Sequence, residues 1–170
     1  LHGHVTGEPK PNEQKRTGMV ELVKRADGKI LARNGGPKLG GNLFIGGGLE
    51  YGEDPLLCAM REIEEETEYT KVELVDTSEH VHHHYFAASK NVARDITATG
   101  LHFKLLGDDR VETHLEENEK GKFTVEWLTP TEAEQRVTDP LHLYIFQQLT
   151  RNETFAGAGL LPHSRPYTAP

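Results

Sequence analysis

The chain has 170 residues, the size of one ordinary domain, with 19 basic and 27 acidic side chains and a net charge of −8. This acidity argues against a general nucleic-acid binder, which needs a basic face, but allows a phosphate-containing substrate if divalent cations screen the site. No apolar run reaches the roughly 18 residues of a membrane-spanning helix, and no signal peptide is visible. Cys58 is the only cysteine, so an intrachain disulfide is excluded and we expect a reducing compartment, the cytoplasm.

The first part of the chain predicts a polar lead-in followed by strands. Residues 1–16 are polar and contain glycine and proline, so we expect them to be loose. Residues 17–33 contain two strand-like runs, and Ala26-Asp27-Gly28 between them is a turn signal that predicts a hairpin. A glycine-rich loop over 34–42 and a short apolar strand over 43–45 follow.

The first helix is predicted to begin at Asp54-Pro55, because aspartate is a good N-cap and proline suits the first helical turn. An apolar stripe at helical spacing follows, and the helix is predicted to end near Glu68. Beyond it we expect strands at 70–76, 80–87, 99–106 and 122–128, and an acidic loop over 107–121. We also expect a short helix from Thr129-Pro130, a final helix from Asp139-Pro140 and a tail over 151–170. This order indicates an α/β fold in which helices pack on a mixed sheet.

Glutamates crowd the second half of the predicted helix, at Glu62, Glu64, Glu65, Glu66 and Glu68. Each like-charge pair at three- or four-residue spacing costs about 0.2–0.5 kcal/mol, and the negative end of the helix dipole adds to that cost. A divalent cation would remove the conflict. Because Glu62, Glu65 and Glu66 share one face, they offer three hard oxygen ligands suited to Mg²⁺ or Mn²⁺. The alternative is a solvated polar helix face.

The preceding loop extends this cluster into a longer pattern. Glycine there allows a backbone to approach a phosphate closely. The stretch consists of Gly47, five residues, Glu53, seven residues, Arg61-Glu62-Ile63, one residue and Glu65-Glu66. This pattern resembles the Nudix box, the signature of the Nudix hydrolases, in every specified position except one. The exception is Glu68, which stands where the family usually has glycine.

The resemblance implies the Nudix fold, an α/β/α sandwich with a mixed β-sheet, over residues 17–150. It also implies metal-dependent hydrolysis of the pyrophosphate bond in a nucleoside diphosphate linked to another group, such as ADP-ribose, a dinucleotide or a nucleoside triphosphate. The expected partner is thus a small nucleotide, without membrane or general nucleic-acid binding. Many members of the family are dimers, which makes a homodimer a family-based expectation.

The resemblance also assigns a role to each matching residue. Glu62, Glu65 and Glu66 would hold Mg²⁺ or Mn²⁺, Glu53 would support the site, Arg61 would orient the carboxylates by ion pairing, and Gly47 would supply a close backbone turn. The cation would bridge substrate and protein and lower the pKa of an attacking water. A left-handed residue usually ends the helix, so glutamate at position 68 is expected to extend the helix or strain its end without removing a metal ligand.

A fainter resemblance covers the flanks of the motif. The segments Phe44-Ile45-Gly46-Gly47, 82–91 and 122–127 are similar to Nudix-type domains inserted in some bacterial leucyl-tRNA synthetases, and the chain opens with Leu1 rather than Met. The alternative expectation is therefore a non-catalytic, Nudix-like nucleotide-binding or accessory domain from a larger protein. The departure from the family pattern favours this alternative, whereas the intact Arg-Glu and Glu-Glu pairs of the motif favour the enzyme.

Two further groups of residues are weaker candidates. The acidic loop offers a water-activating base at Glu112, Glu116, Glu117 or Glu119, with a solvated loop as the alternative. The histidines at positions 80, 82, 83 and 84 look like a metal cluster, but His82 and His84 share one strand face while His83 points to the other. Zinc would need ligands from elsewhere in the chain, so a strand-forming or substrate-facing role is the simpler interpretation.

Overall fold

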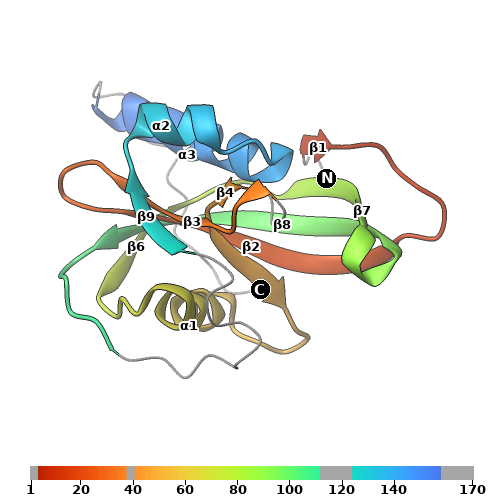
Figure 1. Ribbon diagram of the computed structural model, residues 1–170, viewed down its shortest axis with the longest axis horizontal. Coiled ribbons are helices and arrows are strands. Elements are labelled where there is room, and N and C mark those ends of the chain that lie inside the picture. The colour runs from red at the N-terminus through yellow and green to blue at the C-terminus, as the bar shows by residue number, and fades with distance from the viewer. Residues whose placement is uncertain (1–3, 38–40, 112–123, 158–170) are drawn as a thin grey trace.

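The computed structural model describes residues 4–37, 41–111 and 124–157. The strands are β1 (His4–Thr6), β2 (Gln14–Lys24), β3 (Ile30–Asn34), β4 (Asn42–Leu43), β5 (Ile45–Leu49), β6 (Val72–Thr77), β7 (Val81–Ala87), β8 (Val92–Leu105) and β9 (Thr124–Leu128). The helices are α1 (Pro55–Thr67), α2 (Pro130–Arg136) and α3 (Pro140–Gly157), with a short 3-10 turn, η2 (Ala88–Lys90). Figure 1 shows α1 on one face of the sheet and α2 and α3 on the other.

Strands β2 and β8 form the centre of the sheet. They run parallel, from Gln14 opposite Arg94 to Lys24 opposite Lys104. β5 pairs antiparallel with β2, and β6 and β7 pair antiparallel with β8. β3 pairs with β4 and β9, while β1 pairs parallel with β7. This mixed sheet between helices confirms the α/β/α sandwich that the sequence predicts.

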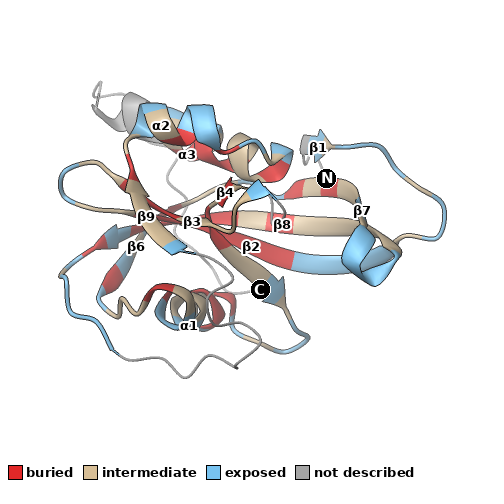
Figure 2. Ribbon diagram, in the orientation of Figure 1, coloured by how far each residue is buried: buried red, intermediate tan, exposed pale blue. Residues whose placement is uncertain are grey.

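Two apolar cores lie on opposite faces of the sheet, visible as the buried centre in Figure 2. β2 supplies both, because alternate side chains of a strand point to opposite faces. Val20 and Leu22 belong to the core that α3 covers, whereas Met19 and Val23 belong to the core that α1 covers. The position between Met19 and Val23 on the α1 face is therefore in the interior of the protein.

Helix α1 has the ends that the sequence predicts. The Asp54 side chain accepts a hydrogen bond of 3.0 Å from the Leu57 backbone N–H, and Pro55 occupies the first turn. The helix ends at Thr67, and Glu68 follows in the left-handed conformation with φ 68°. Its backbone N–H donates to the Glu64 carbonyl at 2.8 Å, which is the bond of a normal left-handed cap. Glutamate at position 68 thus closes the helix and does not extend it.

The structure differs from the expected elements in four places. Gly46, Gly47 and Gly48, expected to form a loop with a close backbone turn at Gly47, lie within β5 and pair with β2. The lead-in over 1–16 contains β1 and the beginning of β2. β8 begins at Val92 instead of 99, because its polar residues pair on both sides: Asp95 lies opposite His84 on one neighbour and Lys15 on the other. α3 continues to Gly157, into the segment expected as a tail. No helix in the described parts of the chain is long and apolar enough to cross a membrane.

Candidate active site

The site is built where β5 passes beneath α1. A Cβ atom added to Gly47 would lie 2.1 Å from both carboxylate oxygens of Glu62, so only glycine leaves room for this side chain. Burial raises the pKa of Glu62; the charge of Arg61 opposes this rise and that of Glu65 adds to it. The backbone of β5 and the helix therefore enclose a carboxylate in a partly buried place, as a cation site needs.

Glu66 lies one turn further along the same face of α1. Its Oε2 is 3.7 Å from the Arg33 guanidinium of β3, and the Glu66 side chain is only 16% exposed. Residues four apart on a helix share a face, so Glu62 and Glu66 both point toward the sheet. Arg33 supplies the cation that holds Glu66 there.

Glu21 is a third carboxylate at this place. It lies on β2 and is completely buried, and neither of its carboxylate oxygens has a hydrogen-bond partner among the described residues. Burial raises its pKa well above the usual value, and the charges of Glu62 and Glu66 raise it further, whereas Arg33 opposes them. An unsatisfied buried polar group costs about 1–3 kcal/mol, so this arrangement lowers the stability of the protein.

Glu53, Arg61 and Glu65 form a separate ion-paired group at the outer edge of α1. Arg61 donates to Glu65 at 3.1 Å and lies 3.6 Å from Glu53. The Glu53 carboxylate also accepts a bond of 2.8 Å from the Glu50 backbone N–H, which fixes the loop before α1. Glu65 is half-exposed, so it lies on the solvent side of this group. Arg61 thus orients two of the predicted carboxylates.

Cys58 connects the two groups of carboxylates. Its buried thiol lies 3.6 Å from Glu53 and 4.0 Å from Glu62, and it accepts a hydrogen bond from Arg61 at 3.4 Å. Burial and the two neighbouring carboxylates raise its pKa to about 11. The thiol is therefore neutral at pH 7 and acts as packing between charged side chains.

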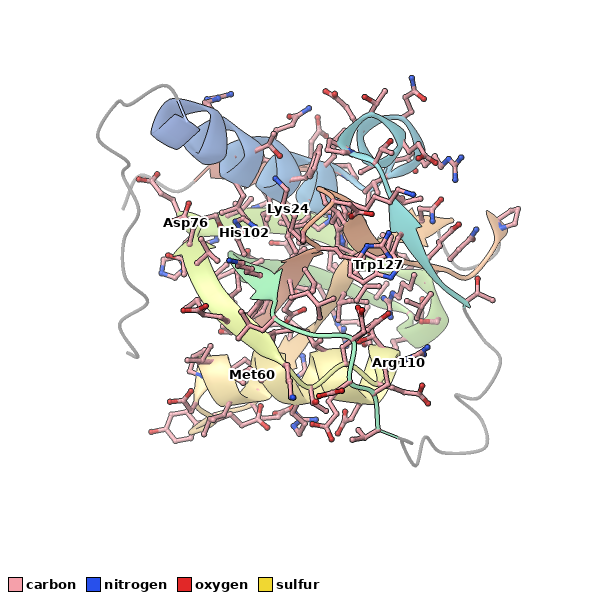
Figure 3. All side chains as sticks on the ribbon, turned by 90° about the vertical axis from the view of Figure 1, so that its left-hand side faces the viewer. Lys24, Met60, Asp76, His102, Arg110 and Trp127 are labelled. Atoms are coloured by element: carbon pink, nitrogen blue, oxygen red, sulfur yellow. The ribbon has the colours of Figure 1, made fainter. Side chains whose placement is uncertain are left out.

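An aromatic and cationic stack borders the C-terminal end of α1. The Tyr69 and Trp127 rings meet edge to face at 5.7 Å, with Arg25 over Trp127 at 4.6 Å and Arg110 over Tyr69 at 5.2 Å. Arg110 also binds the Glu68 carboxylate at 2.9 Å. Figure 3 shows Arg110 near α1, and Trp127 packs against the apolar core that α1 covers. Glu68 is therefore engaged in a surface ion pair.

The weaker candidates divide into two groups. Glu112, Glu116, Glu117 and Glu119 lie outside the described residues. On β7, His84 binds Glu13 at 2.9 Å, and with Asp95 these residues bring three ligand-type atoms within 4.8 Å of one another. His82 lies 3.3 Å from the same Asp95, whereas His83 points the other way and binds Thr6. The histidines thus pair with acids and hydroxyls within the sheet.

The residues at the α1 face fit a divalent cation. The set of donors consists of carboxylates, the hard oxygen ligands that Mg²⁺ and Mn²⁺ prefer. Gly47 leaves a place that any other side chain would fill, and Glu21 has no other partner in the described structure. The charge of one guanidinium, that of Arg33, acts on all three carboxylates, so ionisation of all of them would leave two negative charges for one dication to balance.

Comparison with known proteins agrees with this geometry. The NUDIX domain family profile matches residues 11–149. This match covers most of the chain, so the chain belongs to the Nudix family and is a pyrophosphohydrolase. No curated protein matches the sequence.

Several solved structures have the same fold. The E. coli ORF135 protein has 19% identity, covers 89% of this chain and 97% of its own, and gives a TM-score of 0.55. The E. coli dihydroneopterin triphosphate pyrophosphohydrolase has 17% identity, coverage of 80% and 95%, and a TM-score of 0.57. The C. elegans Ap4A hydrolase in a binary complex has 15% identity, coverage of 82% and 98%, and a TM-score of 0.55. At such identities these likenesses show the fold alone.

Sequence reasoning missed Glu21, although a signal for it exists. The run Met19-Val20-Glu21-Leu22-Val23 places one charged residue in the middle of an apolar strand. A strand buried on both faces has no solvent position for that charge, so the run itself marks a buried acid. The family pattern does not include this position, because it describes only the loop and the helix that follow.

Proposed function

We propose that this protein is a Mg²⁺-dependent hydrolase that cleaves the pyrophosphate bond of a nucleoside diphosphate linked to another group. The observation that carries the proposal is the Glu62 carboxylate seated against Gly47, with Glu66 beside it on the same helix face. Glu62, Glu65 and Glu66 would hold the cation. When bound, Mg²⁺ would neutralise phosphate oxygens and lower the pKa of an attacking water.

The side chains of the chain itself position these groups. Arg33 holds Glu66 toward the sheet, and Arg61 holds Glu53 and Glu65 at the outer edge of α1. Positioning of this kind matters because phosphoryl transfer depends mainly on alignment and on compensation of charge. Glu65 reaches the same cation as Glu66 if its half-exposed side chain leaves Arg61, which costs little for a surface ion pair.

The first experiment is a hydrolysis screen with Mg²⁺, with Mn²⁺ and with chelator. The compounds are ADP-ribose, dinucleotides including Ap4A, nucleoside triphosphates and dihydroneopterin triphosphate; two of these occur in the names of the similar structures. We expect turnover of at least one compound only when a divalent cation is present. Specific binding of a nucleotide without turnover would favour the non-catalytic domain instead.

A pair of glycine variants tests the geometry of the site. Gly47→Ala is expected to displace Glu62 and lower turnover by at least roughly tenfold, or about 1.4 kcal/mol of barrier. Gly48→Ala is the matched control, because a Cβ at Gly48 meets nothing closer than 3.9 Å. Equal turnover in the two variants would contradict the placement of the site.

Removal of metal gives an independent test through stability. The carboxylates of Glu21, Glu62 and Glu66 repel one another without a cation, so saturating Mg²⁺ is expected to raise the melting temperature by mass action. Glu62→Gln is expected to stabilise the metal-free protein and to reduce that gain. The same melting temperature with Mg²⁺ and with chelator, at concentrations that support hydrolysis, would contradict a metal site here.

A further inference from the structure

Glu21 occupies a position that neither packing nor hydrogen bonding accounts for. Its side chain is 0% exposed, between Met19 and Val23 on the α1 face of β2. Both of those neighbours pack into the apolar core with Ala59 and Ile63 of the helix. An apolar residue at position 21 would continue that core, whereas the carboxylate interrupts it.

The sheet register places Glu21 close to Gly47, against which the Glu62 carboxylate lies. Met19 lies opposite Gly47, and Glu21, two residues further along β2, lies opposite Ile45. Residues two apart on a strand point to the same face, so Glu21 points to the face that carries the Glu62 carboxylate. The two glutamates come from opposite sides, one from the sheet and one from α1.

The charged residues that act on Glu21 belong to the same site as Glu62. The carboxylates of Glu62 and Glu66 act on it electrostatically, and Arg33 is the cation that opposes them. Arg33 already pairs with Glu66 at 3.7 Å. Neither oxygen of Glu21 has a hydrogen-bond donor within the part of the chain that the structure describes. A buried carboxylate without a donor beside two further carboxylates is the environment of a metal ligand, because a dication satisfies all of them at once.

We propose that Glu21 is a further ligand of the divalent cation, binding it from the sheet while Glu62 and Glu66 bind it from the helix. This inference rests on the proposed function. Ligands on a strand and on a helix fix the cation against both layers of the fold, so its position does not depend on the helix alone. The metal site of this chain would therefore reach into the core beneath α1, beyond the residues of the Nudix box.

The test is direct binding of Mn²⁺, measured from the loss of its free EPR signal with the full chain. We expect Glu21→Gln to keep the shape of the side chain and weaken Mn²⁺ binding at least tenfold. Glu64→Gln is the matched control, because Glu64 is an exposed residue of α1 with the same charge, and its affinity should stay within about twofold of wild type. Melting in chelator should show that Glu21→Gln folds and is more stable than wild type.

A double variant shows whether the two layers bind the same cation. Glu21→Gln and Glu62→Gln combined should weaken Mn²⁺ binding by less than the product of the two single effects, because each change damages one shared site. If Glu21→Gln does not fold, Glu21→Met serves the same comparison, since it fills the space without a ligand atom.

The outcomes separate this inference from the proposed function. Wild-type affinity for Mn²⁺ in folded Glu21→Gln, with loss of binding in Glu62→Gln, would overturn the role of Glu21 and leave the proposed function standing. Absence of Mn²⁺ binding in the wild-type chain would overturn both, and the hydrolysis screen would show this independently.

Discussion

On each face of the sheet a glycine lets a helix side chain approach a strand closely, but the side chains on the two faces differ in kind. On the α3 face, a Cβ added to Gly100 would lie 2.3 Å from Ile145 Cγ2, so glycine lets an apolar helix residue approach the strand. On the α1 face, Gly47 makes room in the same way for the Glu62 carboxylate. One contact buries apolar area and stabilises the fold. The other brings like charges together and lowers the stability of the fold, which the proposed cation would offset.

The largest expected effect distinguishes the two faces through a pair of isoleucines. Ile145 on α3 and Ile63 on α1 are both 0% exposed. Each change to alanine should lower the free energy of unfolding by about 3 kcal/mol, because a cavity replaces packed side chain. Ile145→Ala should retain wild-type turnover per folded molecule, whereas Ile63→Ala should lower it by shifting the carboxylates of α1. Urea unfolding and initial rates measure the two quantities; equal turnover in both variants would remove the proposed division between the faces.

The next effect is a pH dependence that belongs to the α3 face. His142 accepts a hydrogen bond of 3.1 Å from the Phe44 N–H, and burial lowers the pKa of its ring to about 4. Between pH 6.5, the usual pKa of histidine, and about pH 4, the unfolded chain binds a proton at this ring and the folded chain does not. The free energy of unfolding therefore falls as the pH falls. His142→Asn keeps an acceptor but does not titrate.

The free energy of unfolding should therefore fall by about 2 kcal/mol more in wild type than in His142→Asn between pH 7 and pH 4. This is less than the full pKa shift would give, because the side chain is partly exposed. Unfolding in urea at several pH values, with chelator present, measures this difference. Parallel curves for the two proteins would show that His142 is not the titrating group.

A smaller effect concerns the helix carboxylates. Glu65→Gln and Glu66→Gln should each lower turnover at limiting Mg²⁺ by at least roughly tenfold, or about 1.4 kcal/mol of barrier. The change at Glu66 should be the larger, because Glu66 already points toward the sheet while Glu65 pairs with Arg61. Glu64→Gln is the control for charge. Wild-type rates in both variants would contradict their assignment as ligands.

The smallest effect tests the end of α1. Glu68→Gly should change the free energy of unfolding by a few tenths of a kcal/mol, because glycine suits the left-handed cap but loses the exposed ion pair with Arg110. Mn²⁺ affinity should be unchanged and turnover should stay the same or rise. A large fall in turnover with an intact fold would show instead that Glu68 serves the metal or the water.

The sequence alone predicts the ends of those elements that depend on residues close together in the chain. Asp54 and Pro55 mark the start of α1 in the sequence and in the structure. β8 was predicted too short, because its polar residues gain their partners from β2 and β7, which lie far away in the sequence. Long-range pairing of this kind has no local signature.

For the candidate site too, part follows from local spacing and part from long-range packing. Spacing predicts that Glu62, Glu65 and Glu66 share a face, but Glu65 pairs with Arg61 on the solvent side. The direction of Glu62 and Glu66 toward Gly47 and Arg33 depends on how the helix crosses β5 and β3. The position of Glu21 beneath them depends on the register between β2 and β5, which a single sequence does not provide. The assignment of each residue as a ligand stays a prediction.

The left-handed end of α1 also bears on how the family motif is defined. The Nudix box names glycine at this position, yet Glu68 has the required backbone angle and makes the capping bond. What the position demands is therefore a conformation, and glycine is its most common solution. A motif search that insists on glycine would reject this chain, whereas one that accepts residues tolerant of positive φ, asparagine and aspartate among them, would recover other members with intact carboxylates.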